Sequence, residues 1–391
     1  MKPLTIRQNL ASLPPTAWVL FAGTFINRFG TFVTPFLVLY MTRLGYSIGQ
    51  AGLAAGAYGG GHLAASFLGG HLADRIGRRH TISLSMFASS AAMLALSQAR
   101  SLPLVMMLTF CAGLAAELYR PASHALVTDL VPPEQRVFAF GMYRFAVNLG
   151  FAAGPAMAGF LAEHSFFYLF LCDALTSVGF GVIALLALPH GMRITKREEQ
   201  ESAPLRAALR DKAFVLFLLA TVCITPVDFQ MGSSFALHIK ALGYPASTYG
   251  MLISLNGVLI IVFELLITQV TQRYQARRVI ALGYFLAGFG FALTALAHTL
   301  PLLAMTVAVW TIGEMISSPV AGAYVSHLAP VHLRGRYMGL LTLMWSIGMV
   351  VGPSLGTYVF ARNETALWIG CGVLAILSAT FALMSRPPGT A

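Results

Sequence analysis

The chain has 391 residues and a net charge of +11; 57% of its residues are hydrophobic and only 10% are charged. Soluble domains carry roughly 25% charged residues because their surfaces face water. The composition therefore excludes a soluble enzyme, a disordered protein and a disulfide scaffold, and it predicts an all-α membrane protein. No basic run with interleaved aromatic residues predicts a nucleic-acid partner. The four cysteines lie far apart in apolar runs and predict neither a disulfide nor a metal site.

Apolar runs of about 20 residues, the length that crosses a bilayer as a helix, predict twelve transmembrane helices. A charged stretch separates the first six from the last six. We therefore predict an N-terminal six-helix half at 1–188, a cytoplasmic linker at 189–212 and a C-terminal six-helix half at 213–391. Numbered 1 to 12 in chain order, the predicted spans cover 16–40, 47–70, 81–98, 103–128, 138–162, 165–188, 213–239, 247–271, 279–297, 300–327, 338–360 and 366–385.

The arginines and lysines predict the orientation of these spans. With the N-terminus in the cytoplasm, four of the 25 basic residues face the opposite side and three lie inside spans, which leaves eighteen on the cytoplasmic side. Cytoplasmic loops of membrane proteins are enriched in Lys and Arg, so both termini are predicted to be cytoplasmic. The four opposite residues are Arg43, Arg100, Lys240 and Arg362, and the three inside spans are Arg28, Arg120 and Arg144.

The two predicted halves are copies of one another. Shifted by 198 residues, the sequence matches itself at turn, kink and close-packing residues, which set backbone geometry. Two six-helix halves repeated in parallel are the architecture of a secondary transporter with its site near the membrane midplane, between the halves. The matching pairs include Gly59 and Gly257, Arg75 and Arg273, Pro121 and Pro319, Gly150 and Gly348, and Pro155 and Pro353.

The loop between spans 2 and 3 reads GHLADRIGRR over residues 70–79. It resembles the signature G-x-x-x-D-R-x-G-R-R of the major facilitator superfamily, and the twelve spans and the linker stand where that family has them. The resemblance implies the fold of that family and a gating latch at the cytoplasmic face. In this latch Asp74 would cap the start of span 11 and Arg78 would bond Asp129 at the end of span 4, with Arg75 in the same loop. The alternative is a simple turn rich in positive charge.

Spans 5 and 11 carry small residues at every fourth position next to a proline, at 150–159 and 348–356. This spacing allows close approach of two helices, and the proline adds a kink. In the superfamily that the chain resembles, the span-5 version is called the antiporter motif and is associated with export. The alternative is generic helix packing.

Two patterns typical of enzymes do not support catalysis. The segment 45–49 matches the G-x-S-x-G pattern of hydrolases, but Ser47 is predicted in a short turn between two spans and not in a strand–turn–helix. No G-x-x-x-x-G-K-[S/T] sequence is present, so ATP-driven pumping is not expected. We predict that the protein is not an enzyme.

Ionisable residues inside spans are costly and are therefore candidates for function. The resemblance implies that spans 1, 4, 7 and 10 line the cavity, helped by 2, 5, 8 and 11. Acids in a low dielectric without a base favour the protonated form, so we predict four carboxylates in proton and substrate coupling, with arginines as cavity charge partners. The carboxylates are Glu117, Asp228, Glu264 and Glu314, and the arginines are Arg28, Arg120 and Arg144. Asp173 in span 6 is predicted to be structural, and His62, His124 and His238 are weaker candidates for proton carriers.

We interpret the chain as a secondary active transporter that resembles the 12-span drug/H+ antiporters of the superfamily. It would export small amphipathic or cationic compounds by alternating access, driven by a proton gradient and without another cofactor. Its expected partners are the substrate, protons and the lipid bilayer, and it is expected to be a monomeric multi-pass protein of the bacterial inner membrane. The alternative is an anion, organic-phosphate or metabolite exchanger in which Arg28, Arg120 and Arg144 clamp the substrate. The acid-rich C-terminal half argues against it.

Overall fold

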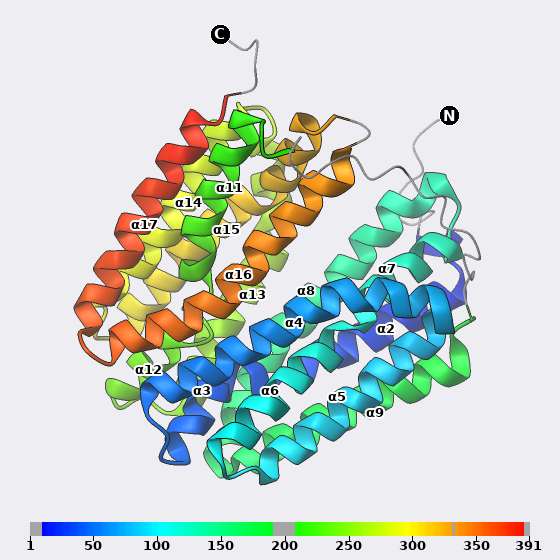
Figure 1. Ribbon diagram of the computed structural model, residues 1–391, viewed down its shortest axis with the longest axis horizontal. Helices are drawn as coiled ribbons and strands as arrows, with labels where there is room; N and C mark the ends of the chain where they lie inside the picture. Colours follow the sequence, from blue (N-terminus) through cyan, green and yellow to red (C-terminus); the bar gives the residue numbers. More distant parts are fainter. Residues whose placement is uncertain (1–9, 191–207, 331–332, 387–391) are drawn as a thin grey trace. The chain divides into compact units, whose positions relative to one another are not determined.

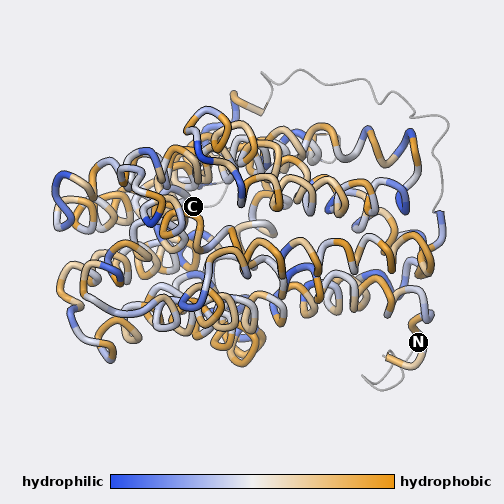
Figure 2. Tube along the Cα trace, turned by 90° about the horizontal axis from the view of Figure 1, so that it is seen from below, coloured by the Kyte–Doolittle hydropathy of each residue, from blue (hydrophilic) through white to orange (hydrophobic). Residues whose placement is uncertain are grey.

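Every regular element of the described part of the chain is a helix, as expected when backbone groups have no water to bond with in a bilayer. The computed structural model describes residues 10–190, 208–330 and 333–386. Most of the predicted linker, 191–207, lies outside the described residues. Figure 2 shows hydrophobic residues along most of the length of the helices.

The helices follow the apolar runs of the sequence in order (Figure 1). Those of the first half are α2 (Pro15–Phe29), α3 (Val33–Arg43), α4 (Ile48–Ile76), α5 (Arg78–Gln98), α6 (Leu102–Glu117), α7 (Tyr119–Leu130), η1 (Pro133–Gln135), α8 (Arg136–His164) and α9 (Phe166–Ala187). Those of the second half are α11 (Lys212–Asp228), α12 (Ser234–Ala241), α13 (Ala246–Thr271), α14 (Ala276–Leu293), η2 (Thr294–Leu296), α15 (Leu300–Leu328), α16 (Arg334–Phe360) and α17 (Glu364–Met384).

The internal repeat is present in the helix boundaries. Five helices of the second half begin 198 residues after a helix of the first: 48 and 246, 78 and 276, 102 and 300, 136 and 334, and 166 and 364. The two first spans are also interrupted at corresponding places, after Phe29 and after Asp228. The sequence match therefore reflects a repeated backbone and not only repeated hydrophobicity.

Nine helical segments of the described residues are long and apolar enough to cross a membrane. The remaining three predicted spans differ for physical reasons. The first and seventh are each divided into two shorter helices, and α4 is long enough but rich in glycine, which lowers its hydropathy. An all-helical membrane fold is confirmed, whereas the number of twelve spans stays a prediction.

Contacts group the chain into two compact units. Unit 1 comprises Met1–Pro35 and Gly60–Arg197, and unit 2 comprises Phe36–Gly59 and Glu198–Ala391. The core of unit 1 gathers buried side chains such as Leu20, Tyr119 and Phe180. The division of the chain into halves at 189–212 stays a prediction.

Glycines explain why residues 36–59 belong to unit 2. In this segment α4 presents glycines toward α16. A Cβ atom added at Gly52, Gly56 or Gly59 would lie 2.6, 2.8 or 2.7 Å from a carbonyl oxygen of α16. Only glycine permits backbones to approach so closely.

Candidate functional site

A buried cluster of charged residues in unit 1 surrounds Glu117, the last residue of α6. Its side chain is only 7% exposed, and three basic groups contact it. Nη2 of Arg28 lies 3.3 Å from one carboxylate oxygen, while Nε of Arg120 and Nε2 of His62 lie 3.0 and 3.4 Å from the other. Two guanidinium groups face one carboxylate, so the cluster is positive even when His62 is neutral.

A helix break places Glu117 in this cluster. Pro121 has no N–H to donate to the carbonyl of Glu117, and the helix is interrupted at Leu118. Ser85 on α5 repairs the break, because its hydroxyl donates to the carbonyl of Ala115 and accepts the N–H of Tyr119 at 3.0 Å. The break therefore leaves few backbone groups without a hydrogen bond. Glu117 ends the segment before the break, and Arg120, which contacts its carboxylate, lies in the segment after it.

Arg28 occupies the last turn of α2, just before the interruption of span 1. Helix α8 holds this turn closely: a Cβ atom at Gly150 would lie 2.7 Å from the backbone nitrogen of Phe29, and one at Gly154 would lie 2.5 Å from its carbonyl oxygen. Beyond the interruption, the carboxylate of Asp173 accepts the N–H of Val33, the first residue of α3, at 3.3 Å. The antiporter-type glycines and Asp173 thus fix the helix end that carries Arg28.

Unit 2 contains a pair of carboxylates. Asp228 is the last residue of α11, and its charge interacts with that of Glu314 on α15. The amide of Asn256 on α13 donates to Glu314 at 3.1 Å and to the hydroxyl of Thr311 at 2.9 Å. Asp228 is half-buried and Glu314 is exposed on its helix. The structure thus brings together two of the four predicted coupling acids.

The end of α11 is built to keep Asp228 in place. The side-chain amide of Gln230 donates to the carbonyls of Pro226 and Gly352, both at 2.8 Å, and so joins this helix end to α16. A Cβ atom at Gly352 would lie 2.8 Å from the Pro226 carbonyl oxygen. The C-terminal end of a helix carries partial negative charge, which adds to the negative potential of the two acids.

The two remaining predicted site residues are Glu264, a coupling acid, and Arg144, a cavity charge partner. Glu264 is half-buried on α13, and Arg144 is exposed on α8. Their roles in coupling stay predictions.

The predicted latch residues lie at one end of unit 1. Arg78, buried at the start of α5, forms an ion pair with Asp129 on α7 and donates to the carbonyl of Ala125 at 3.0 Å. Asp74 is exposed in the last turns of α4 and interacts with the charge of Arg78. Arg75 is exposed beside it. The pairing that the resemblance implied is present, and its gating role stays a prediction.

Two residues with little signal in the sequence belong to the charged clusters. His62 had little weight as a lone histidine, yet its ring contacts Glu117. Asn256 was not singled out, although an amide inside an apolar span is itself a signal because it must find a partner there. The hydrolase-like Ser47 has a different role: its hydroxyl accepts the N–H of Gln50, whose side chain accepts the N–H of Ser47, which is a capping box at the start of α4.

Solved structures with the same fold are transporters. The chain aligns with a POT family transporter in complex with 5-aminolevulinic acid with a TM-score of 0.81 and 18% identity, over 98% of this chain and 100% of that one. It aligns with a D-xylose-proton symporter with a TM-score of 0.76 and 15% identity, over 95% and 98% of the two chains. At these identities the likeness shows the fold alone.

Curated proteins of similar sequence cover nearly the whole chain. The chain is 29% identical to the uncharacterized MFS-type transporter YttB of Bacillus subtilis, over 95% of each protein. It is 25% identical to a Na(+), Li(+), K(+)/H(+) antiporter of Planococcus maritimus, over 92% of this chain and 91% of that protein. It is 26% identical to the multidrug resistance protein MdtH of Aeromonas hydrophila, over 92% of each.

A family model described as Major Facilitator Superfamily matches residues 20–239 and 228–391, which together cover nearly the whole chain. The repeated helices, the interrupted first spans and the loop at 70–79 agree with that match. The chain belongs to the Major Facilitator Superfamily of membrane transporters.

Proposed function

We propose that this transporter is a proton-coupled antiporter that exports cationic or amphipathic compounds across the bacterial inner membrane, with both termini in the cytoplasm. The observation that carries the proposal is the pair formed by Asp228 and Glu314 in unit 2. Two nearby carboxylates repel each other when both are charged. A proton or a bound cation relieves this repulsion, so the two ligands compete for the same pair.

The surroundings of the pair strengthen this competition. Asp228 ends α11, where the helix adds negative potential, and Asn256 donates to Glu314 with one N–H of its amide. The amide orients the carboxylate without neutralising it. A cation that binds the pair must therefore displace a proton, which is the exchange that an antiporter requires.

The cluster around Glu117 has a complementary role in the proposal. Its carboxylate already contacts two guanidinium groups, so it is neutralised within unit 1. We assign the proton chiefly to the acids of unit 2 and a positioning role to Glu117, which holds Arg28 and Arg120 in the membrane.

The names of two relatives support the proposal. One of them is named as a multidrug resistance protein and another as a monovalent cation/H+ antiporter. Small monovalent cations are therefore tested beside organic cations.

A second function, exchange of anions or organic phosphates, is favoured by one observation. The unit 1 cluster holds two guanidinium groups for one carboxylate, and the side chain of Arg120 is 44% exposed. In this function Arg120 would bind the anion, while Arg28 would retain its ion pair with Glu117.

The test uses proteoliposomes that contain a fluorescent pH indicator and carry an imposed pH gradient. Ethidium, Na+ and an organic phosphate are added separately, and proton flux is recorded. We expect ethidium or Na+ to dissipate the gradient with the wild type but not with Asp228→Asn or Glu314→Gln. Glu134→Gln, which removes an exposed acid of η1, is the matched control and should behave as the wild type.

Two results would contradict the proposal. Normal cation-driven proton flux in both variants of the pair would exclude these acids as carriers. Flux that responds only to the organic phosphate, and that is lost in Arg120→Gln, would establish the anion exchanger instead.

A further inference from the structure

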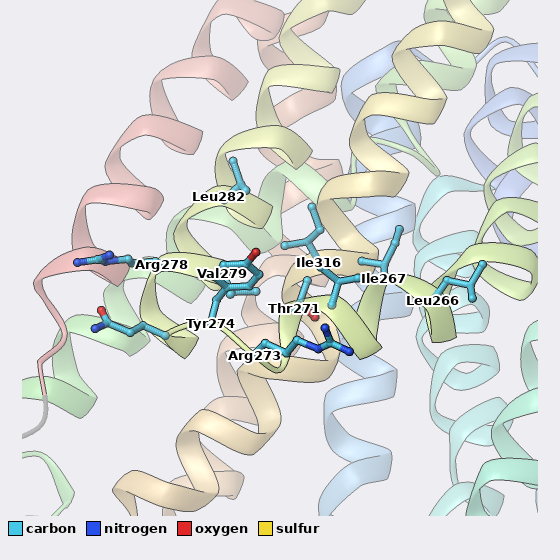
Figure 3. Close-up of a pocket in the computed structure, with 11 residues that line it drawn as sticks. Leu266, Ile267, Thr271, Arg273, Tyr274, Arg278, Val279, Leu282 and Ile316 are labelled. Carbon is cyan, nitrogen blue, oxygen red and sulfur yellow. The ribbon is translucent and has the colours of Figure 1, made fainter.

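A pocket of about 750 Å³ lies in unit 2 between α13 and α14, at the end where these helices are connected (Figure 3). Its volume falls within the range of roughly 300–1,000 Å³ that is typical of ligand pockets. Both helices pack against α15, which contributes Ile316 to the lining. The pocket is amphipathic, with apolar residues along the helices and polar residues at the connecting loop. The apolar lining is Leu266, Ile267, Val270, Val279, Leu282 and Ile316.

This pocket is separate from the carboxylate pair. Glu314 and Ile316 are two positions apart on α15, and residues with this spacing do not face each other because each position turns the helix by about 100°. Ile316 lines the pocket, so Glu314 lies on another face of α15. The pocket is therefore not part of the proposed site for the proton and the transported cation.

Two arginines stand at the polar end. Arg273 follows the end of α13, Arg278 lies in the first turn of α14, and both are exposed. Figure 3 shows Arg273 beside Thr271, below Tyr274, and Arg278 on the opposite side of the pocket. Within the part of the chain that the structure describes, neither guanidinium group forms an ion pair or a side-chain hydrogen bond.

The neighbouring arginine behaves differently. Arg277 donates to the carbonyl of Leu383 at the end of α17, so it is engaged in packing. Helix α14 adds further positive character, because its first turn has no acidic residue and the side chain of Gln275 does not cap it. The loop is the second-half copy of residues 70–79, and it keeps arginines although Gln272 stands at the position of Asp74.

We propose that this pocket binds an anionic phospholipid of the surrounding bilayer, with the headgroup attracted by the positive potential of Arg273 and Arg278 at the polar end and an acyl chain along the apolar lining. Charge complementarity identifies the headgroup as anionic. The lining continues from the polar end into an apolar surface with exposed leucines, Leu266 and Leu282 at 58% and 52%, and this surface suits an acyl chain. The bound lipid would bridge α13 and α14 over α15.

The test is native mass spectrometry of delipidated protein in a neutral detergent, titrated with phosphatidylglycerol, phosphatidylcholine or inorganic phosphate. A basic residue near a membrane surface strengthens binding of anionic lipid by about fivefold, so loss of both arginines should weaken it by roughly 30-fold. We expect this loss of phosphatidylglycerol in Arg273→Gln with Arg278→Gln, and weak binding of phosphatidylcholine to the wild type.

Two further variants separate the charge from the pocket. Arg336→Gln with Arg386→Gln removes two exposed arginines outside the pocket lining and should change the affinity by less than about threefold. Val270→Trp fills the apolar part without changing the charge and should also weaken binding of phosphatidylglycerol. Because Val270 is exposed, this variant keeps the test open if the double arginine variant fails to fold.

Three outcomes would overturn the proposal. The first is wild-type affinity for phosphatidylglycerol in the double arginine variant, and the second is equal loss in the control variant. The third is displacement of the lipid by millimolar inorganic phosphate together with unchanged binding in Val270→Trp, which would describe a soluble-anion site.

Discussion

The substitution Glu117→Gln removes the single carboxylate from the cluster of unit 1. Arg28 and Arg120 then lose their shared partner, while the side chain of Arg28 stays only 15% exposed. Removal of one member of a buried ion pair typically costs about 3–5 kcal/mol because the remaining buried charge loses that counter-charge. For a unit of this size such a loss corresponds to a fall in melting temperature of about 10 °C.

A second substitution at either arginine restores the wild-type net charge, but the two double variants are not equivalent. Glu117→Gln with Arg28→Gln leaves Arg120, whose side chain is 44% exposed and can reach water. Glu117→Gln with Arg120→Gln leaves the more deeply buried Arg28 facing a neutral amide. We expect the first double variant to recover most of the lost stability and the second to recover less.

Thermal unfolding in detergent measures the stability, and uptake into proteoliposomes measures the transport of the same samples. If the cluster belongs to the transport site, both double variants stay inactive even where stability returns. Recovery of transport together with stability would show instead that the cluster only neutralises charge in the membrane. The electrostatic reasoning itself would be refuted by a melting temperature of Glu117→Gln within 2 °C of the wild type, or by equal recovery in the two double variants.

Three further predictions concern the scaffold. Gly150→Leu should abolish transport, because its side chain would force α8 away from the end of α2; Gly141→Leu on the same helix meets open space and should transport normally in the same flux assay. Ser85→Ala should lower the free energy of unfolding by about 1–3 kcal/mol, measured by thermal unfolding, because it leaves a buried backbone N–H after the break in span 4 without its partner. Asp129→Asn and Asp74→Asn should slow tracer flux while substrate affinity in detergent stays within about threefold of the wild type.

The last of these predictions separates a latch from a binding residue. A latch acts on the equilibrium between conformations, so its loss changes the rate of transport more than the affinity of the substrate site. Wild-type flux in both aspartate variants would show that the loop at 70–79 is a turn without a gating role.

The sequence by itself determined the helical membrane fold, its repeat and its family. The length of an apolar run and its scarcity of charge are local properties, and they predict transmembrane helices directly. The 198-residue offset of the sequence reappears in five pairs of helix starts. The candidate functional residues were also visible, since charged residues such as Glu117 and Asp228 stand out in apolar runs. What these patterns could not provide was which charges meet.

Only the tertiary structure decided those partnerships. Arg28 is 89 residues from Glu117 in sequence. His62 and Asn256 likewise contact carboxylates on other helices, Glu117 and Glu314. The helix breaks were likewise not visible in the sequence, because an interrupted span has the same hydropathy as a continuous one. The side chains of Ser85 and Gln230 form hydrogen bonds with the backbone near these breaks. Hydropathy averages over a segment, whereas an ion pair or a repaired break depends on the positions of single atoms that several helices bring together.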